Sequence, residues 1–538
     1  MKRVLRTTAW LLAMLMLLGT TAFAWEAPTG NFKYFRDIPE GDYWAKQDIE
    51  WCTDYQVMKD MGNRREFEPE TALSRAMFVQ ICANLVTQMG QDVSYTTVTD
   101  YPDVVDDWYY DAVQWASEKG IVSGYEDGTF LPNASVTRAE MAQMMYSFLT
   151  VYCGLTLDTD PTKANETYAD AATLPAWAMD AIAAMTNLGL LVGKEGYFHA
   201  DGTATRAEAA AIVHRLQQYY NSNPQCFTGK KLTLVWNDEF DGTELDMSKW
   251  RYGACGNLTA FGEAFADPEY VLQYQKDHIK VENGNLVMNV EYMDNSVMNP
   301  NDENYCGDQN CSVVWIDTAA DTAAGETERK YEQTYGYFEM RCILGTGSGS
   351  NCAFWMGAGK AWDPASESSR DGAEIDVFES IYTSTNFFED GIEYRPKVES
   401  TVHWQHNAYD ENGNKLGGKD NSYFWAEQRV TREEKYLPID MFDGNYHTIG
   451  VLWTEEEYVF YYDGYEMYRT DCISTPENGL PATAQGTCEA PAWLLISCHF
   501  MDPDWYGPSS PEDYPTDFIV DYVRCYQLND YLNEQPQA

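Results

Sequence analysis

The 538-residue chain has few basic residues for its length. Its 36 Lys and Arg residues stand against 84 Asp and Glu residues, which gives a formal net charge of −48. A polyanion of this size is repelled by nucleic acid and by anionic membranes, so we expect neither as a partner. The charge is typical of a solvated acidic surface outside the cell.

Cysteine and histidine are also scarce. The 13 cysteines are too sparse for a disulfide scaffold, and their number is odd. Two pairs are close enough to close a loop each, Cys306 with Cys311 and Cys472 with Cys488. Neither the cysteines nor the seven scattered histidines have the spacing of zinc ligands, so we expect no zinc site.

Long hydrophobic runs are absent beyond the first residues. Basic residues at 2, 3 and 6 precede an apolar segment, residues 10–18, and the small-residue site Ala22-Phe23-Ala24. This order predicts a secretory signal peptide over residues 1–24. The alternative, a membrane anchor, needs about 20 apolar residues, and the segment is far shorter. We therefore expect export without membrane insertion.

Three related segments follow, over residues 31–92, 98–156 and 165–220. In the second copy, Gly120 ends an apolar helical pattern, and Thr137 with Glu140 forms a capping box that begins a second helix. Each copy therefore predicts a helix, a glycine-rich turn and another helix. An arginine recurs after the turn, at positions 75, 138 and 206.

This pattern resembles the S-layer homology (SLH) domain, which usually occurs as three copies in a pseudo-threefold, all-α bundle. The resemblance implies noncovalent attachment to a secondary cell-wall polysaccharide of a bacterial envelope. A guanidinium offers a rigid fork of donors to an anionic polymer. The expected polymer-binding residues are the repeated arginines Arg75, Arg138 and Arg206, with Trp44, Trp108 and Trp177 framing the grooves. The alternative is that the tryptophans lie in the core and the arginines are structural.

Residues 219–225 form a short polar join, which predicts that the second unit lies close to the first. From Leu232 onward, short runs rich in Val, Ile, Tyr, Phe and Trp alternate with Gly, Asn and Asp turns. Many short strands with hairpin turns predict an antiparallel β-sandwich over residues 228–530.

Residues 371–380, DGAEIDVFES, place three carboxylates in one strand-like run. Acidic residues are depleted in strands, so three together need a reason. In a regular strand Glu374 and Asp376 share one face and Glu379 takes the other. A one-residue β-bulge between Asp376 and Glu379 returns all three to one face. The two Glu carboxyls then lie about 6 Å apart, near the separation in a retaining glycosidase.

With its surroundings this motif resembles glycoside hydrolase family 16, the laminarinase and lichenase group, in its bulged, laminarinase-type form. The matching segments are, in order, residues 236–250, 335–341, 353–356, 402–404, 446–454, 460–464 and 520–526. The resemblance implies a jelly roll with the cleft on its concave sheet. It makes Glu374 the nucleophile and Glu379 the general acid/base, and Asp376 would orient the nucleophile. Neighbouring negative charge should raise the pKa of the acid. The alternative is a solvated acidic edge strand or a Ca²⁺ site.

Further site residues follow from the resemblance. Trp355 and Trp404 would stack against sugar rings, although either could belong to the sandwich core. His403 would bond a substrate hydroxyl or a catalytic carboxylate, or be a satisfied core histidine. Trp505 lies in a Pro/Asp-rich segment and is a weaker cleft candidate. No cofactor is required, and Glu239 with Asp521 are the expected ligands of a structural Ca²⁺.

The match weakens at residues 270–274, 294–332 and 497–505, which leaves the preferred linkage open. The leading interpretation is a secreted, wall-anchored, endo-acting, retaining hydrolase of β-1,3- or mixed β-1,3-1,4-glucan. The alternatives are a β-galactan hydrolase or transglycosylase of the same family, and a noncatalytic carbohydrate-binding surface protein. The three mutually repelling acids oppose the last alternative.

Overall fold

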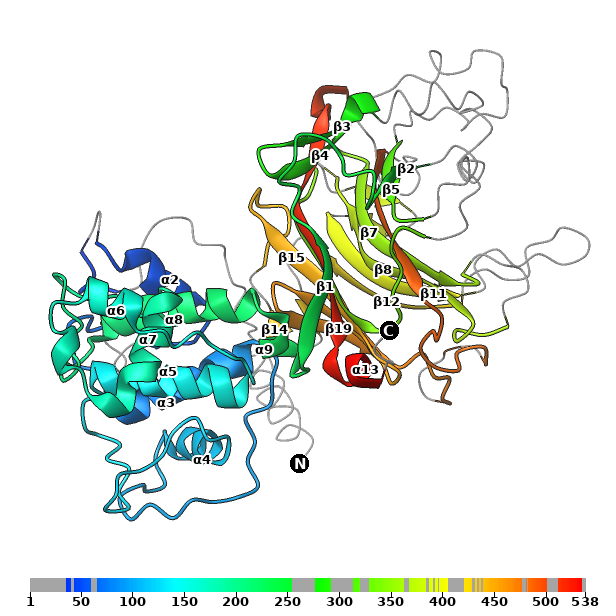
Figure 1. Ribbon diagram of the computed structural model, residues 1–538. Helices are drawn as coiled ribbons and strands as arrows, with labels where there is room; N and C mark the ends of the chain where they lie inside the picture. Colours follow the sequence, from blue (N-terminus) through cyan, green and yellow to red (C-terminus); the bar gives the residue numbers. More distant parts are fainter. Residues whose placement is uncertain are drawn as a thin grey trace, which may run out of the picture.

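The computed structural model describes residues 35–39, 43–59, 65–253, 276–291, 313–319, 329–361, 367–383, 387–389, 392–394, 396–404, 420–427, 431–432, 435–436, 439–476, 480, 482–500 and 511–534. A helical part precedes a β part (Figure 1). The predicted signal peptide, the Cys306–Cys311 pair and Trp505 lie outside the described residues. In the part of the chain that is described, no helix combines the length and apolar character needed to cross a membrane.

The helical part contains two main helices from each repeat. Its elements are α2 (Lys46–Asp54), α3 (Arg75–Gln88), α4 (Tyr110–Glu118), α5 (Arg138–Ser147), η1 (Phe148–Tyr152), α6 (Thr162–Thr167), η2 (Ala171–Thr173), η3 (Ala176–Ala178), α7 (Met179–Asn187), α8 (Arg206–Asn221) and α9 (Pro224–Thr228). The predicted capping box is present at the start of α5, where Thr137 and Glu140 bond each other's backbone N–H. Thr205 and Glu208 repeat it at α8.

The three repeats close into a ring. The second helix of each repeat packs against the first helix of the next: α3 on α4, α5 on α7, and α8 on α2. Isolated β-bridges join the segments that lead into α3, α5 and α8, such as Ser74 with Ser135 and Thr137 with Thr203. This region, which we call the bundle, is therefore mainly helical, and short β-bridges join its repeats.

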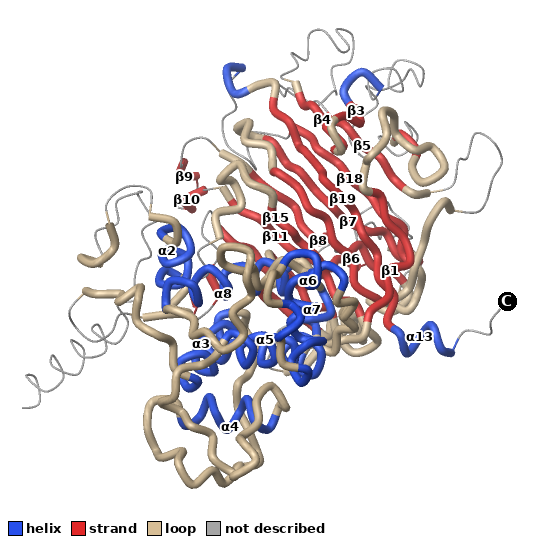
Figure 2. The backbone as a smooth tube through the Cα atoms, turned by 60° about the vertical axis from the view of Figure 1, so that its left-hand side comes forward, coloured by secondary structure: helices blue, strands red, loops and turns tan. Residues whose placement is uncertain are grey.

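The β part is an antiparallel sandwich, as predicted, and Figure 2 shows its strands running side by side. One sheet has the order β17 (Tyr465–Thr470), β16 (Tyr458–Tyr462), β15 (His447–Trp453), β6 (Gly336–Ile343), β19 (Thr516–Leu528), β4 (Asn285–Val290) and β3 (Ile279–Glu282), with β1 (Leu232–Asp238) also paired to β19. The other has the order β12 (Asp420–Glu427), β11 (Lys397–Trp404), β8 (Gly372–Ile381), β7 (Ser350–Gly359), β18 (Ala492–Phe500), β5 (Val313–Asp317) and β2 (Arg251–Tyr252). Smaller elements are β9 (Phe387–Glu389), β10 (Ile392–Tyr394), β13 (Thr431–Arg432), β14 (Lys435–Tyr436), η6 (Pro511–Asp513) and α13 (Asn529–Glu534). We call the first sheet the back sheet and the second, on which the family resemblance places the cleft, the cleft sheet.

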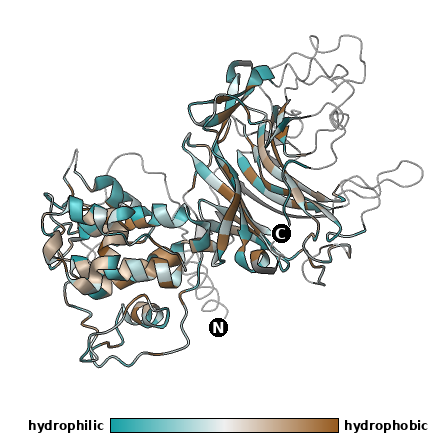
Figure 3. Cartoon of the chain, in the orientation of Figure 1, coloured by the Kyte–Doolittle hydropathy of each residue, from teal (hydrophilic) through white to brown (hydrophobic). Residues whose placement is uncertain are grey.

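The core lies between the two sheets. Phe378 of the cleft sheet meets Phe518 of the back sheet edge to face, with ring centroids 6.3 Å apart. Ser400 Oγ and Tyr462 OH lie 2.9 Å apart across the same gap, so a buried polar pair is satisfied there. Figure 3 shows hydrophobic stretches on the strands of both sheets and on the helices of the bundle.

A short helix joins the two parts. Phe227 of α9 is 1% exposed and packs against Tyr337 and Tyr461 of the back sheet, at 5.7 and 4.9 Å between ring centroids. Tyr55 of the bundle also stacks on Tyr465 of that sheet. The close join predicted from residues 219–225 is therefore present. The bundle lies on the back sheet, away from the cleft sheet (Figure 1).

Candidate active site

The acidic strand β8 carries the predicted bulge. Glu379 lies opposite Ala353 of β7 and Asp376 opposite Trp355, so three steps along β8 match two along β7. The same slip appears on the other side, where Glu399 and Thr401 of β11 face Glu379 and Asp376. One extra residue therefore sits between Asp376 and Glu379 on β8. It brings Glu374, Asp376 and Glu379 to one face.

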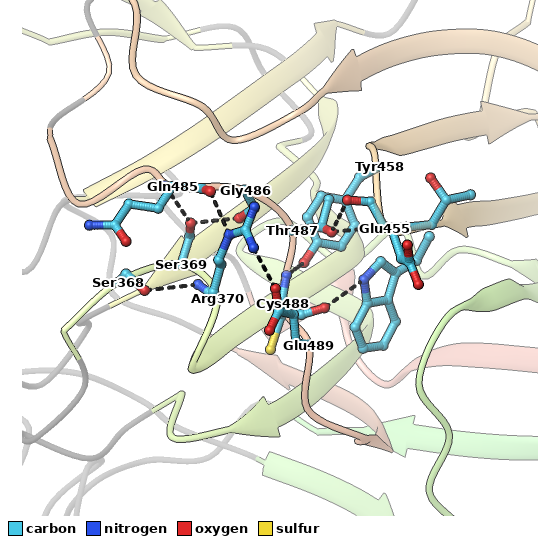
Figure 4. Close-up of polar contacts among 12 residues, drawn as sticks. Ser368, Ser369, Arg370, Glu455, Tyr458, Gln485, Gly486, Thr487, Cys488 and Glu489 are labelled. Carbon is cyan, nitrogen blue, oxygen red and sulfur yellow. Dashed lines mark hydrogen bonds and ion pairs between the residues drawn. The ribbon is translucent and has the colours of Figure 1, made fainter.

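The start of β8 is held tightly. A Cβ on Gly372 would lie 2.2 Å from the carbonyl carbon of Lys360, so only glycine fits at this hairpin. The preceding turn is tied to the segment before β18, as Figure 4 shows. Ser369 Oγ donates to Gly486 O (2.6 Å), and Arg370 Nε donates to Gln485 O (2.6 Å). These bonds fix the strand that carries the acids.

Asp376 is buried at the centre of the acid cluster, and Glu374 and Glu379 are half-buried on either side of it. Asp376 is 2% exposed, and burial, with the nearby Glu399 charge, raises its pKa to about 8. Burial also raises the pKa of Glu379 to about 8, helped by the charges of Asp376, Glu374 and Glu399 and opposed by His403. A carboxyl with such a pKa holds a proton at neutral pH and can act as an acid.

His403 joins this cluster from β11. Its Nε2 lies 3.2 Å from Asp376 Oδ2, and ligand atoms of Glu374, Asp376 and His403 all lie within 4.8 Å of one another. Among the described residues, these three form the sole group of at least three side chains that could hold a metal ion. Of the three roles considered for His403, contact with a catalytic carboxylate is the one that the geometry favours.

Aromatic side chains line the same face of the cleft sheet. Trp355, opposite Asp376 on β7, donates from Nε1 to Ser497 Oγ (3.1 Å) and meets Trp315 edge to face at 5.2 Å. Trp315 was missed by sequence reasoning, because its face is known only from the pairing of β5 with β18. The prediction that Trp404 stacks against a sugar ring is wrong, because Trp404 is fully buried and its Nε1 donates to Thr483 Oγ1. Trp404 belongs to the core and offers no surface to a sugar.

The repeated arginines of the bundle are also buried, with exposures of 4% at Arg75, 7% at Arg138 and 4% at Arg206. Each guanidinium bonds two carbonyl oxygens of the next repeat. Arg75 donates to Phe130 O (2.9 Å) and Ser123 O (3.3 Å); Arg138 to Phe198 O (2.8 Å) and Val192 O (2.6 Å); Arg206 to Phe67 O (2.7 Å) and Lys59 O (2.6 Å).

These contacts correct the prediction that the arginines grip a polymer. Each guanidinium joins neighbouring repeats and also lies over a Phe ring of the next repeat, at 4.5 to 5.2 Å from its centroid. The alternative structural role is the one found. The tryptophans behave in the opposite way: Trp44, Trp108 and Trp177 are 59%, 55% and 60% exposed. They are not core residues and are available to a ligand.

The S-layer homology domain profile matches residues 34–77, 100–142 and 167–210. The profile of glycosyl hydrolases family 16 matches residues 266–493. The chain carries three SLH domains followed by a family 16 domain. The order predicted from the sequence is thus confirmed.

Several relatives share parts of the chain. An amylopullulanase from Thermoanaerobacterium thermosulfurigenes is 33% identical over 34% of this chain and 9% of its own length. A glucan endo-1,3-beta-glucosidase A1 from Niallia circulans is 24% identical over 55% of the chain and 38% of its own length. A beta-glucanase from Rhodothermus marinus is 25% identical over 55% of the chain and 85% of its own length. The chain thus spans less than half of the first two.

Among solved structures, the laminarinase from Rhodothermus marinus matches with a TM-score of 0.36 and 23% identity. The match covers 55% of this chain and 98% of that one.

The calcium ligands predicted for the family 16 domain are held by different arginines. Glu239 is bidentate to Arg524, at 2.8 Å for both bonds, and Asp521 pairs with Arg341. Glu239 borders an acidic cavity of about 340 Å³, formed by residues between 237 and 249 with Val281, which does not include Asp521. Glu239 directly follows β1 and Asp521 lies on the paired strand β19, and their binding of Ca²⁺ stays a prediction.

Cys472 and Cys488, which the sequence allows to pair, are both free thiols in the structure. A closer pair was missed: Cys352 and Cys498 face each other on β7 and β18, with Sγ atoms 3.3 Å apart.

Proposed function

We propose that the family 16 domain is an endo-acting, retaining glycoside hydrolase that cleaves β-1,3- or mixed β-1,3-1,4-glucans. The observation that carries this proposal is the bulged strand β8, which brings Glu374, Asp376 and Glu379 to one face beside Trp355. Two carboxyls on one face, one of them protonated at neutral pH, are what a double displacement at a sugar carbon needs.

In the first step Glu374 attacks the anomeric carbon, and the glycosidic C–O bond breaks. Glu379 gives its proton to the departing oxygen, which leaves as a hydroxyl. The sugar is then held as an ester on Glu374. In the second step Glu379, now ionised, takes a proton from water, whose oxygen displaces Glu374. The configuration at the anomeric carbon is retained after two inversions.

Asp376 and His403 support the nucleophile. A raised pKa keeps a proton on Asp376 near neutral pH, so Asp376 can donate a hydrogen bond within the cluster rather than add a second negative charge beside that of Glu374. His403 Nε2 lies 3.2 Å from Asp376 Oδ2 and would help to hold that carboxyl in place. This arrangement favours the ionised form of Glu374, which the attack requires.

The substrate class rests on the relatives and on the aromatic face. Relatives covering 55% of the chain include a protein named glucan endo-1,3-beta-glucosidase and one named beta-glucanase. Trp355 and Trp315 offer half-buried ring surface beside the acids, which suits the apolar faces of sugar rings. The β-1,3 or mixed β-1,3-1,4 linkage is the most specific part of the proposal.

We also propose that the SLH bundle attaches the exported chain to a cell-wall polysaccharide. The three exposed tryptophans, at equivalent places in the repeats, are the candidate contacts. The buried arginines would contribute by holding the repeats together. Relatives of this part include a cellulosome-anchoring protein from Acetivibrio thermocellus and an S-layer protein from Bacillus thuringiensis.

The test is release of reducing ends from laminarin and lichenan by the full chain. We expect turnover by the wild-type protein and a loss of at least 10³-fold in Glu374→Gln, with an unchanged melting temperature. Glu282→Gln, an exposed position on β3, is the matched control and should retain activity. Binding of these glucans without release of reducing ends would contradict the proposed hydrolysis and would favour the noncatalytic alternative.

A further inference from the structure

A fourth carboxylate faces the general acid of the proposed reaction. Glu399 of β11 lies directly opposite Glu379 of β8 in the antiparallel pairing. Side chains at opposite positions share a face of the sheet, and their Cβ atoms lie about 4.5–5.5 Å apart. Two like charges at such a pair repel each other, so this position needs an explanation.

Glu399 carries its own counter-ion. Lys397, two residues earlier on the same strand and therefore on the same face, forms an ion pair with Glu399 through Nζ and Oε1. The two side chains are 25% and 23% exposed, so both reach the outer surface of the cleft sheet and neither is sealed in the core. A negative group and a positive group thus stand side by side next to Glu379.

We propose that Glu399 and Lys397 are a pair of positioning residues that sets the pH range over which Glu379 keeps its proton. Glu399 strengthens the hold of Glu379 on the proton, and Lys397 limits that effect by neutralising Glu399. The inference deepens the proposed hydrolytic function and rests on it, because Glu379 is taken as the general acid.

The other groups around Glu379 do not replace this pair. On β8, Glu374 and Asp376 also face the cleft and raise the pKa of Glu379, while His403 on β11 lowers it. On β7 the residue opposite Glu379 is Ala353, which carries no charge. Among the described side chains, Lys397 is the cation paired with Glu399, so removing the charge of one or of the other should have opposite effects on Glu379.

The experiment is the pH profile of kcat/KM on laminarin for the full chain and its variants. The alkaline limb reports loss of the proton from the general acid. Removing the negative charge in Glu399→Gln should move this limb down by about half a pH unit or more, the size expected for a unit charge roughly 5 Å away in wet surroundings. Removing the cation in Lys397→Gln leaves Glu399 uncompensated and should move the limb up.

Controls separate this effect from structural damage and from failure of the proposed function. Glu282→Gln makes the same charge change on the back sheet and should leave the alkaline limb in place. Glu399→Asp keeps the negative charge and should give the limb its wild-type position. The inference is overturned if the alkaline limb stays fixed in Glu399→Gln or in Lys397→Gln, or if it moves in the same direction in both. If Glu399→Gln does not fold, the direction of the shift in Lys397→Gln is the test. Absence of hydrolysis in the wild-type protein would instead reject the proposed function.

Discussion

Substitution of Arg138 distinguishes a structural role, joining neighbouring repeats, from a role in binding the wall polymer. Arg138→Met keeps an apolar stem beside Phe198 but removes both donors, which leaves the carbonyls of Phe198 and Val192 without this partner. A hydrogen bond from a charged donor contributes about 1.5–3 kcal/mol, so losing two costs about 3–6 kcal/mol. For a unit of this size each kcal/mol lowers the melting temperature by roughly 2–4 °C.

We therefore expect the thermal transition of the bundle in Arg138→Met to fall by about 6–24 °C, measured by calorimetry on the full chain. Arg36→Met, at an exposed position, is the matched control and should shift it by less than about 2 °C. If the arginine served the polymer instead, Arg138→Met would keep its melting temperature and lose binding to isolated cell walls. That result would refute the structural role.

The remaining predictions concern the tryptophans, the pH dependence of stability and the join. Replacing Trp44, Trp108 and Trp177 together with alanine should abolish retention on isolated cell walls with no change in melting temperature; retention like that of the wild-type protein would exclude them as contacts. The raised pKa of Asp376 means that the folded state binds this proton more tightly than the unfolded state, so its contribution to stability is present below pH 4 and is lost as pH rises towards 8. The gain in melting temperature of Asp376→Asn over the wild-type protein should consequently grow from pH 4 to pH 8, and a constant difference in urea or heat melts would contradict this. Phe227→Ala should cost about 3–5 kcal/mol by leaving a cavity between α9 and the back sheet, seen as a lower midpoint in urea; an unchanged midpoint would show that the join is not packed.

The sequence predicted the acidic strand well because alternation along a strand is a local rule. Three acids at positions 374, 376 and 379 can share a face only if one residue is extra, and both neighbouring strands show that slip. The same rule separates His403 from Trp404. As consecutive strand residues they point to opposite faces, so one reaches the cleft and the other enters the core.

The residues that sequence reasoning misassigned or missed depend on nonlocal neighbours. A guanidinium bonds carbonyl oxygens as readily as an anionic polymer, and only the ring of repeats shows that Arg138 reaches the next repeat. Trp315 and Glu399 are placed on the face of the acids by strand pairings with segments distant in the sequence. No local pattern specifies those registers.

In the proposed mechanism Glu374 forms a covalent bond to the sugar during turnover. The most direct measurement is peptide mass spectrometry after incubation with a 2-deoxy-2-fluoro β-glucobiosyl fluoride, which slows breakdown of the intermediate. The predicted result is one disaccharide added to the peptide with residues 371–380, on Glu374. Label on Glu379, or hydrolysis of laminarin to products of inverted configuration with no label on the chain, would contradict it.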